Sequence, residues 1–231
     1  MQVLLNDSLF FGVMISLIGY ELGLFIRKKF KKAFLNPLLI SIVFVIVFLL
    51  VFDINYEDYY EGAKYISYLL TPATVCLAIP LYEQLELLKR HKKAIIWGIS
   101  SGVLASLLSV LLFSLLFHLS HEEYVTLLPK SITTAIGMVI SEELGGIPNI
   151  TVAVIIITGV FGNMIAEVVC RIFHIQDPIA KGLAIGTASH AMGTTKAIEL
   201  GEIEGAMSSL SIAVAGLLTV IGAPIFASLI S

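Results

Sequence analysis

The densest group of chemically useful residues lies between residues 182 and 196, inside an otherwise apolar stretch. Glycines at three positions accompany hydroxyl side chains and one imidazole. Glycines permit an unwound turn, and a half-helix that begins there offers free backbone N–H groups at the positive end of its dipole. We expect five residues of this cluster to bind an anion such as a carboxylate: Thr187, Ser189, His190, Gly193 and Thr194. The alternative is close helix packing through small residues, with hydroxyls bonded to their own backbone.

A second cluster combines one lysine with three hydroxyls: Lys130, Ser131, Thr133 and Thr134. A lysine at membrane depth is costly unless it faces protein, water or an anion. We therefore predict an anion-attracting turn here, against the alternative that the Lys130 stem reaches to the outer interface. A third break, around Pro72, would supply the opposite wall of the site through Thr71 and Thr74. Its alternative is an ordinary proline kink.

Other polar residues inside apolar segments point to few further functions. Asn163 and Glu167 lie one helical turn apart and share a face, where they could couple proton movement, or else lie among lipid headgroups. Ser189 and His190 are adjacent, so on a helix they point about 100° apart and cannot form a nucleophile and base pair. The chain has no HExxH, CxxC or phosphate-loop motif. We expect neither an enzyme nor a metal or cofactor site, and no nucleic-acid partner.

The composition places these clusters in a membrane. The chain has 231 residues, of which 58% are hydrophobic and 13% charged, with a mean hydropathy of +0.97. Soluble domains carry about 25% charged residues. A helical span needs roughly 20 apolar residues. We predict an all-α integral membrane protein with seven to eight transmembrane segments, of which 65–88 and 178–198 are broken; the candidates are 8–26, 37–52, 65–88, 94–117, 148–171, 178–198 and 206–230.

The basic residues predict the orientation of these segments. Nine of the 14 Lys and Arg residues lie in 27–32 and 89–93, so both loops should face the cytoplasm and the amino terminus the outside. If the shorter stretch 125–143 crosses the membrane, Arg171 and Lys181 fall outside, against the rule. If 125–143 enters from outside and turns back, both residues fall inside. We prefer this re-entrant interpretation.

The single domain 1–231 is predicted to contain two inverted halves, 8–118 and 125–231. Each half has a proline-started helix, an interrupted segment and an uninterrupted helix. Inverted repeats with broken helices at corresponding positions are typical of transporters and indicate the binding site. A rival match weakens this interpretation, since 72–79 also resembles 129–136.

Several segments resemble the LrgB/CidB family across nearly the whole chain: 36–40 (NPLLI), 71–75 (TPATV), 128–134 (LPKSITT), 180–190 (AKGLAIGTASH), Gly193-Thr194 and 204–210 (EGAMSSL). The resemblance implies an antiholin-like or holin-like regulator of murein hydrolase activity and autolysis. Such proteins are usually encoded with a smaller LrgA/CidA-type membrane protein. Related members carry small carboxylates, namely pyruvate in some bacteria and glycolate and glycerate in plastids.

The sequence therefore leads to two hypotheses of different classes. The first is a carrier of small monocarboxylates such as pyruvate, linked to control of murein hydrolase activity. It lies in the bilayer of a bacterial cell membrane, as a homo-oligomer or with an LrgA/CidA-type partner. On this hypothesis, replacing His190 by alanine should weaken uptake by more than about tenfold. The second is a holin-like or antiholin-like pore that regulates lysis without transporting a substrate. Polar residues concentrated in short breaks favour the carrier.

Overall fold

The computed structural model describes residues 10–30, 35–69, 72, 75–76 and 78–230. Every regular element within these residues is a helix. The chain divides into two compact units, Met1–Cys76 and Leu77–Ser231, called unit 1 and unit 2 below and described separately. The predicted all-α class is thus confirmed for the described part of the chain.

Among its described residues, unit 1 contains three long helices: α2 (Phe11–Phe30), α3 (Pro37–Val51) and α4 (Tyr56–Ser67). Helix α3 begins where Asn36 Oδ1 accepts a hydrogen bond from Leu38 N at 2.8 Å, with proline at the first helical position. Helix α2 packs against both partners, and Ser16 Oγ lies 2.8 Å from the Tyr59 hydroxyl. The predicted binding residues Thr71 and Thr74 lie outside the described residues.

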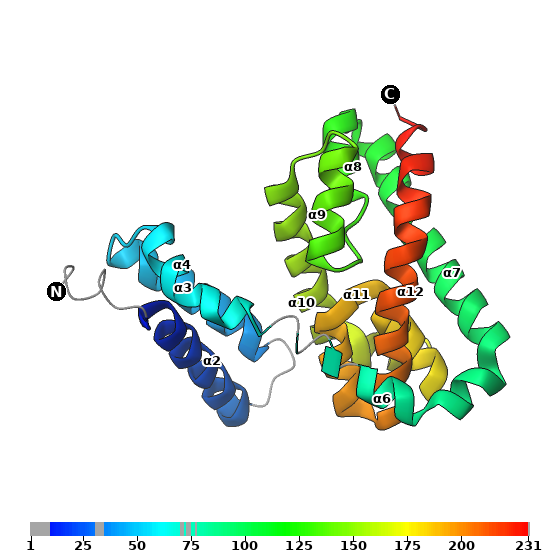
Figure 1. Ribbon diagram of the computed structural model, residues 1–231, viewed down its shortest axis with the longest axis horizontal. Helices are drawn as coiled ribbons and strands as arrows, with labels where there is room; N and C mark the ends of the chain where they lie inside the picture. Colours follow the sequence, from blue (N-terminus) through cyan, green and yellow to red (C-terminus); the bar gives the residue numbers. More distant parts are fainter. Residues whose placement is uncertain (1–9, 31–34, 70–71, 73–74, 77, 231) are drawn as a thin grey trace. The chain divides into compact units, whose positions relative to one another are not determined.

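Unit 2 contains three helices that are long and apolar enough to cross a membrane, α7 (Leu85–Phe117), α10 (Pro148–Ile172) and α12 (Glu202–Ala227) (Figure 1). Helix α7 bends at His91, where φ is −107° and ψ is 17°. The short α6 (Ala78–Glu83) packs on α12. Large apolar side chains such as Trp97 and Leu112 are exposed, as expected where lipid surrounds a helix.

Between α7 and α10 the chain forms hairpin A, residues 121–143. It consists of α8 (His121–Leu127), a turn at 128–133, and α9 (Thr134–Glu143). The base of the hairpin is tied to the start of α10, because Ile147 N donates to Thr126 Oγ1 at 2.8 Å. Helix α9 runs back antiparallel to α10: Ser141 contacts Thr151 at 2.7 Å, and Gly137 packs on Ile155. Hairpin A therefore enters and leaves at one end of unit 2. This is the backbone path that the re-entrant interpretation of 125–143 requires, and that interpretation stays a prediction.

Helix α11 (Pro178–Leu200) is also a hairpin, because the chain reverses within it at His190, where φ is 42° and ψ is −140°. The inbound leg (178–189) runs antiparallel to α10, with Lys181 beside Arg171 at its base. The return leg (191–200) runs parallel to α10, and Leu200 returns to the same pocket as Lys181. Ile185 and Ala197 pack between the legs. We call residues 178–200 hairpin B.

Hairpin B corrects the prediction that 178–198 crosses the membrane as a broken helix. Its legs of twelve and ten residues are about 18 and 15 Å long at a helical rise of 1.5 Å per residue, against a hydrocarbon core of about 30 Å. The predicted count of seven to eight spans is not confirmed, nor is an inverted repeat of 8–118 and 125–231. Unit 2 instead contains a smaller inverted pair, in which each hairpin is followed by a long helix.

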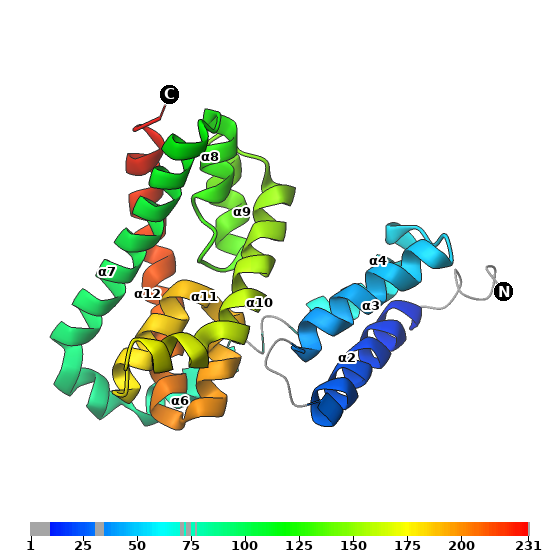
Figure 2. The same ribbon diagram turned by 180° about the vertical axis from the view of Figure 1, so that it is seen from behind.

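The two hairpins enter unit 2 from opposite ends (Figures 1 and 2). The end that holds the base of hairpin A is the acidic end, with Glu122, Glu123, Glu142 and Glu143. The other end, where hairpin B is based, holds six cations, Lys89, Arg90, Lys92, Lys93, Arg171 and Lys181, together with six carboxylates, Glu83, Glu86, Asp177, Glu199, Glu202 and Glu204. We call it the basic end because, of the two ends, it alone carries lysine and arginine among the described residues. Gly137 of hairpin A and His190 of hairpin B both contact Ile155. The two hairpins therefore meet inside unit 2, at Ile155 of α10.

Candidate functional site

A groove of about 780 Å³ lies between α7 and the inbound leg of hairpin B. It begins at the basic end, beside Ala94 and Asp177, and ends at the turn of hairpin A, beside Ser109 and Lys130. The groove therefore brings together one residue of the predicted 187–194 cluster, Thr187, and two of the predicted 130–134 cluster, Lys130 and Ser131. Its remaining lining residues are Gly98, Ser101, Gly102, Ala105, Ser106, Ile179, Ala180, Leu183, Ala184 and Ala188.

Lys130 provides the positive charge at the inner end of the groove. Its side chain is half-buried, and its Nζ donates to Ser131 Oγ at 3.1 Å. Ser131 Oγ in turn lies 3.0 Å from Ser106 Oγ on α7. No carboxylate in the described residues forms an ion pair with Lys130. An ammonium group whose protein partners are hydroxyls is suited to bind an anion, because hydroxyls do not neutralise its charge.

The chain places Lys130 there because α8 cannot continue through Pro129. Proline lacks the N–H that the helix would need, and its ring clashes with the preceding turn. Two tight backbone bonds then form the turn, from Lys130 N to Leu127 O at 3.2 Å and from Ile132 N to Pro129 O at 3.3 Å. Thr133 and Thr134 follow at the start of α9. Both are half-buried, and neither lines the groove.

The side wall of the groove depends on a close approach of α7 and hairpin B at Gly102. A Cβ at this position would lie 2.6 Å from Thr187 Cγ2. The Thr187 hydroxyl itself donates to Leu183 O at 2.5 Å, so it is already bonded within its own helix. Thr187 therefore shapes the groove, while Lys130 and Ser131 supply its charge and free hydrogen-bonding capacity.

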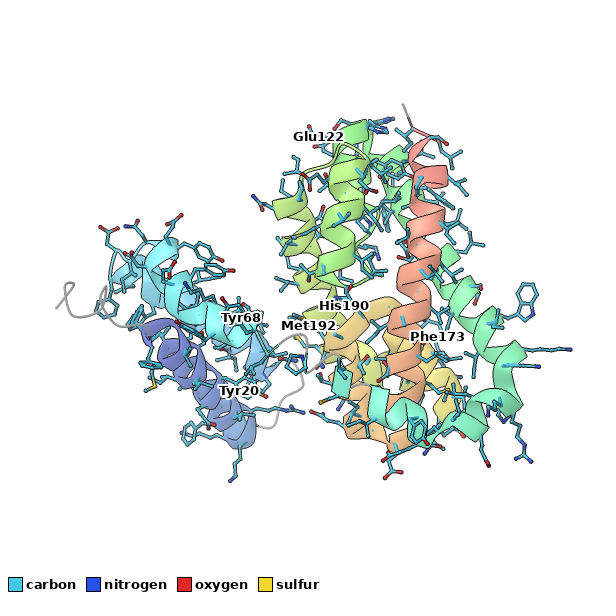
Figure 3. All side chains as sticks on the ribbon, in the orientation of Figure 1. Tyr20, Tyr68, Glu122, Phe173, His190 and Met192 are labelled. Atoms are coloured by element: carbon cyan, nitrogen blue, oxygen red, sulfur yellow. The ribbon has the colours of Figure 1, made fainter. Side chains whose placement is uncertain are left out.

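The tip of hairpin B turns away from this groove, towards α10 and α12 (Figure 3). His190 is buried, with its Nε2 3.0 Å from Ile155 O. Thr194 Oγ1 donates to His190 O at 3.0 Å and lies 2.7 Å from Ser208 Oγ on α12. Ser189 packs so tightly on Gly162 that a Cβ there would collide with its Oγ. Ser189, His190 and Thr194 therefore hold the chain reversal, as does the close packing of Gly193 on Ile185 and Ser189.

Comparison with known proteins identifies the family of this membrane bundle. The model of the LrgB-like family matches residues 16–229. The chain belongs to the LrgB-like family. It is 38% identical over 224 residues to the antiholin-like protein LrgB of Bacillus subtilis (strain 168), an alignment that covers 96% of this chain and 97% of that protein. No solved structure matches the chain.

Two further relatives extend the same likeness. The antiholin-like proteins LrgB of Bacillus cereus (strain B4264) and Bacillus anthracis (strain CDC 684) are each 40% identical over 218 residues, covering 94% of this chain and 95% of each protein. The resemblance inferred from the sequence motifs is thus confirmed. The groove of unit 2 is therefore part of a member of the LrgB-like family, and these relatives are named antiholin-like proteins.

Asn163 and Glu167 of α10 support the return leg of hairpin B. Asn163 Nδ2 donates to Met192 O at 2.7 Å and to Thr195 Oγ1 at 2.9 Å. Glu167 pairs with Lys196 at 3.3 Å and with Arg171 at 3.4 Å, and its side chain is 52% exposed. Lys196 also pairs with Glu199 at 3.3 Å. Within the described residues, no three His, Cys, Asp or Glu side chains gather as metal ligands.

The sequence analysis missed the α7 face of the groove. Small and hydroxyl residues recur there at helical spacing: Gly98, Ser101, Gly102, Ala105, Ser106 and Ser109. Positions i, i+3, i+4, i+7 and i+8 share one helix face. The stretch 94–117 contains no charge and no proline, so a search for breaks and charges passes over it. A search for a stripe of small polar residues would have found it.

Proposed function

We propose that this protein is a membrane carrier of small monocarboxylates, such as pyruvate, that binds the anion at the inner end of the groove. The observation that carries the proposal is Lys130, a cation with hydroxyl partners and no carboxylate partner in the described residues. The bound carboxylate would accept hydrogen bonds from Lys130 Nζ and from the Ser131 and Ser106 hydroxyls. A groove of about 780 Å³ also falls within the usual range for small-molecule sites.

The same proposal includes the orientation. Cytoplasmic loops carry an excess of lysine and arginine, so the basic end, where the groove begins, would face the cytoplasm of a bacterial cell. The loop at 27–32 would lie on the same side, with the amino terminus outside. Two opposed hairpins that meet at mid-depth support a carrier, because half-helices from both ends converge on a central site in many transporters.

The link to lysis comes from the relatives, whose name describes them as antiholin-like. We propose that carboxylate flux through the groove feeds the control of murein hydrolase activity and autolysis. A smaller LrgA/CidA-type membrane protein and further copies of this chain are the proposed partners. Residues of hairpin B (Ser189, His190, Gly193 and Thr194), together with Thr133 and Thr134, would then contribute by holding the tips that border the site. Thr71 and Thr74 remain proposed contributors.

The alternative is a holin-like or antiholin-like pore that regulates lysis without a substrate, and the name of the relatives is compatible with either function. The two functions differ in a measurable way. A carrier gives saturable uptake of radiolabelled pyruvate into vesicles and retains a trapped dye. A pore releases the dye and gives flux that rises linearly with concentration. Purified protein in vesicles, alone and then with its partner, separates the two.

Lys130→Met tests the site itself. Loss of a hydrogen bond to a charged ligand costs about 1.5–3 kcal/mol, so KM for pyruvate should rise by more than about tenfold. Lys196→Gln is the matched control, because Lys196 is paired with two carboxylates outside the groove. Equal KM values for wild type and Lys130→Met would refute the assignment of the anion site to this groove.

A further inference from the structure

The charges of the groove are distributed unevenly along its length. Its lining holds two ionisable side chains, Lys130 at the inner end and Asp177 at the mouth. Asp177 caps the amino terminus of hairpin B, where its Oδ1 accepts from Ala180 N at 2.9 Å. It lies ten residues before Thr187, or about 15 Å along the inbound leg. An anion entering from the basic end therefore passes a carboxylate before it reaches the ammonium group.

The middle of the groove is apolar and small. On the side of hairpin B, Ala184 and Ala188 expose their methyl groups one helical turn apart. On the side of α7, Ala105 is exposed next to Ser106, which belongs to the hydroxyl pair at the inner end. A substrate whose carboxylate binds Lys130 consequently directs the rest of its chain along these three alanines towards the mouth.

A second carboxylate on the same substrate would have no cation to bind. It would lie against the methyl groups of Ala184 and Ala188, with the like charge of Asp177 as the next ionisable group. Removing a charge from water without a partner is strongly unfavourable. Dicarboxylates are therefore disfavoured because the middle of the groove has no cation in its lining, whereas a methyl or methylene tail fits there.

We infer that Ala184 and Ala188 determine the charge class of the substrate, so that the groove accepts short monocarboxylates and rejects dicarboxylates of equal size. This inference rests on the proposed carrier function, and it assigns specificity to residues outside the anion-binding group. Ala184 and Ala188 are specificity-determining by the shape and neutrality of their side chains. A cation introduced at Ala184 would create a second anion subsite about one helical turn nearer the mouth than Thr187, and one introduced at Ala188 would create it beside Thr187.

The direct test compares two substrates that differ at one group. Malonate carries a carboxylate where propionate carries a methyl group, so their sizes are close. In vesicles that contain the wild-type protein, kcat/KM for malonate uptake should be at least about tenfold below that for propionate. Equal values for the two acids would overturn the inference while leaving the carrier function intact. Absence of saturable uptake for both propionate and pyruvate would instead refute the carrier function.

A gain-of-function variant tests the residues. Ala188→Lys and Ala184→Lys should each raise kcat/KM for malonate relative to propionate by at least about tenfold. Ala188→Gln is the matched control, since it has a similar length without the charge and should leave the ratio unchanged. A ratio that stays at the wild-type value in both lysine variants, with propionate uptake retained, would refute the assignment to these alanines. If neither lysine variant folds, the wild-type ratio still decides whether the groove selects by charge.

Discussion

Hairpin A and hairpin B reach the interior of unit 2 from opposite ends, but the polar side chains at their turns have different surroundings. The turn of hairpin A presents Lys130 to the groove with hydroxyl partners alone. The tip of hairpin B buries His190 and Thr194 and bonds them to α10 and α12. Polar density in a membrane segment therefore marks where the chain reverses. We propose that a charge without a carboxylate partner, where it faces a groove, marks a ligand site.

Two of the three lysines in these hairpins, Lys130 and Lys196, illustrate the same difference. Lys196, on the return leg of hairpin B, lies 3.3 Å from both Glu167 and Glu199. Lys130 has no such carboxylate in the described part of the chain. Paired charges of this kind hold an element in place and need no ligand. Lysine content alone would not separate the two roles.

The largest expected effect concerns the close contact between Ser189 and Gly162, which holds the tip of hairpin B against α10. A Cβ at Gly162 would collide with Ser189 Oγ and would lie 2.6 Å from Ser189 Cβ, which rotation of the hydroxyl group cannot move away. Gly162→Ala should therefore destabilise the protein by roughly 3 kcal/mol, measured as a lower midpoint of thermal unfolding in detergent. Gly222→Ala is the control, because its Cβ would meet the flexible Leu107 Cδ1 at 3.0 Å. Equal midpoints for the two variants would contradict the tight contact.

The next effect tests whether hairpin B has one face on the groove and one face in the core. Ala188 is exposed in the groove, while the neighbouring Ser189 is 3% exposed. With Cys76 and Cys170 replaced by serine, Ala188→Cys should react with a membrane-impermeant maleimide at least about a hundredfold faster than Ser189→Cys. The buried thiol reacts only when the tip opens locally, which costs several kcal/mol. Similar rates from the basic end would show that both faces are reached by water.

His190 offers the sharpest contrast between the sequence-based and structure-based views of hairpin B. Because its ring bonds to Ile155 O away from the groove, His190→Ala should cost about 1–3 kcal/mol of stability and change KM for pyruvate by less than about threefold. His190→Gly should recover part of that stability, since glycine readily adopts the φ of 42° found there. A tenfold rise in KM at unchanged stability would instead support direct binding by His190.

The smallest effect lies at the base of hairpin A, outside the membrane-spanning segments. Hydrogen bonds from Ser120 N at 2.8 Å and from the Ser120 hydroxyl at 2.9 Å lower the pKa of Glu123 below its ordinary value of 4.5. The ionised group therefore stabilises the start of α8 above about pH 4.5, and this contribution is lost as pH falls through the lowered pKa. Amide-exchange protection of residues 121–124 should decrease about twofold to threefold in acid. Glu123→Gln should remove the pH dependence; if it persists, another group is responsible.

Part of this architecture could be predicted from residue types alone. High hydropathy predicted membrane helices, and the glycine and hydroxyl cluster at 182–196 predicted a break, which the structure places at His190. Lys130 after Pro129 predicted a polar turn, because proline ends α8 wherever the helix packs. These predictions hold because each depends on local chemistry that tertiary contacts do not reverse.

Other parts depend on packing that no local pattern records. Residues 178–198 have the length of one crossing helix, and a single residue with positive φ converts that length into two short legs. Two contacts favour this conformation: Ser189 packs on Gly162, and the His190 ring bonds to Ile155 O. Gly162 and Ile155 lie 28 and 35 positions before His190 in the chain. The groove face of α7 was missed for a similar reason, since its serines matter only once Ser131 and Thr187 lie opposite.

The half-depth of the two hairpins has an electrical consequence. If water fills the groove as far as Lys130, it carries the potential of the basic end inward, and the membrane voltage would fall mainly across the layer between the hairpin tips and the acidic end. A lone charge that crosses only this layer therefore exchanges nearly the full energy of about 2.3 kcal/mol per 100 mV. In a protein built this way, the charge on Lys130 would lie at one boundary of the membrane field, and only its movement through the whole of that layer would respond to voltage as strongly as passage through the entire bilayer.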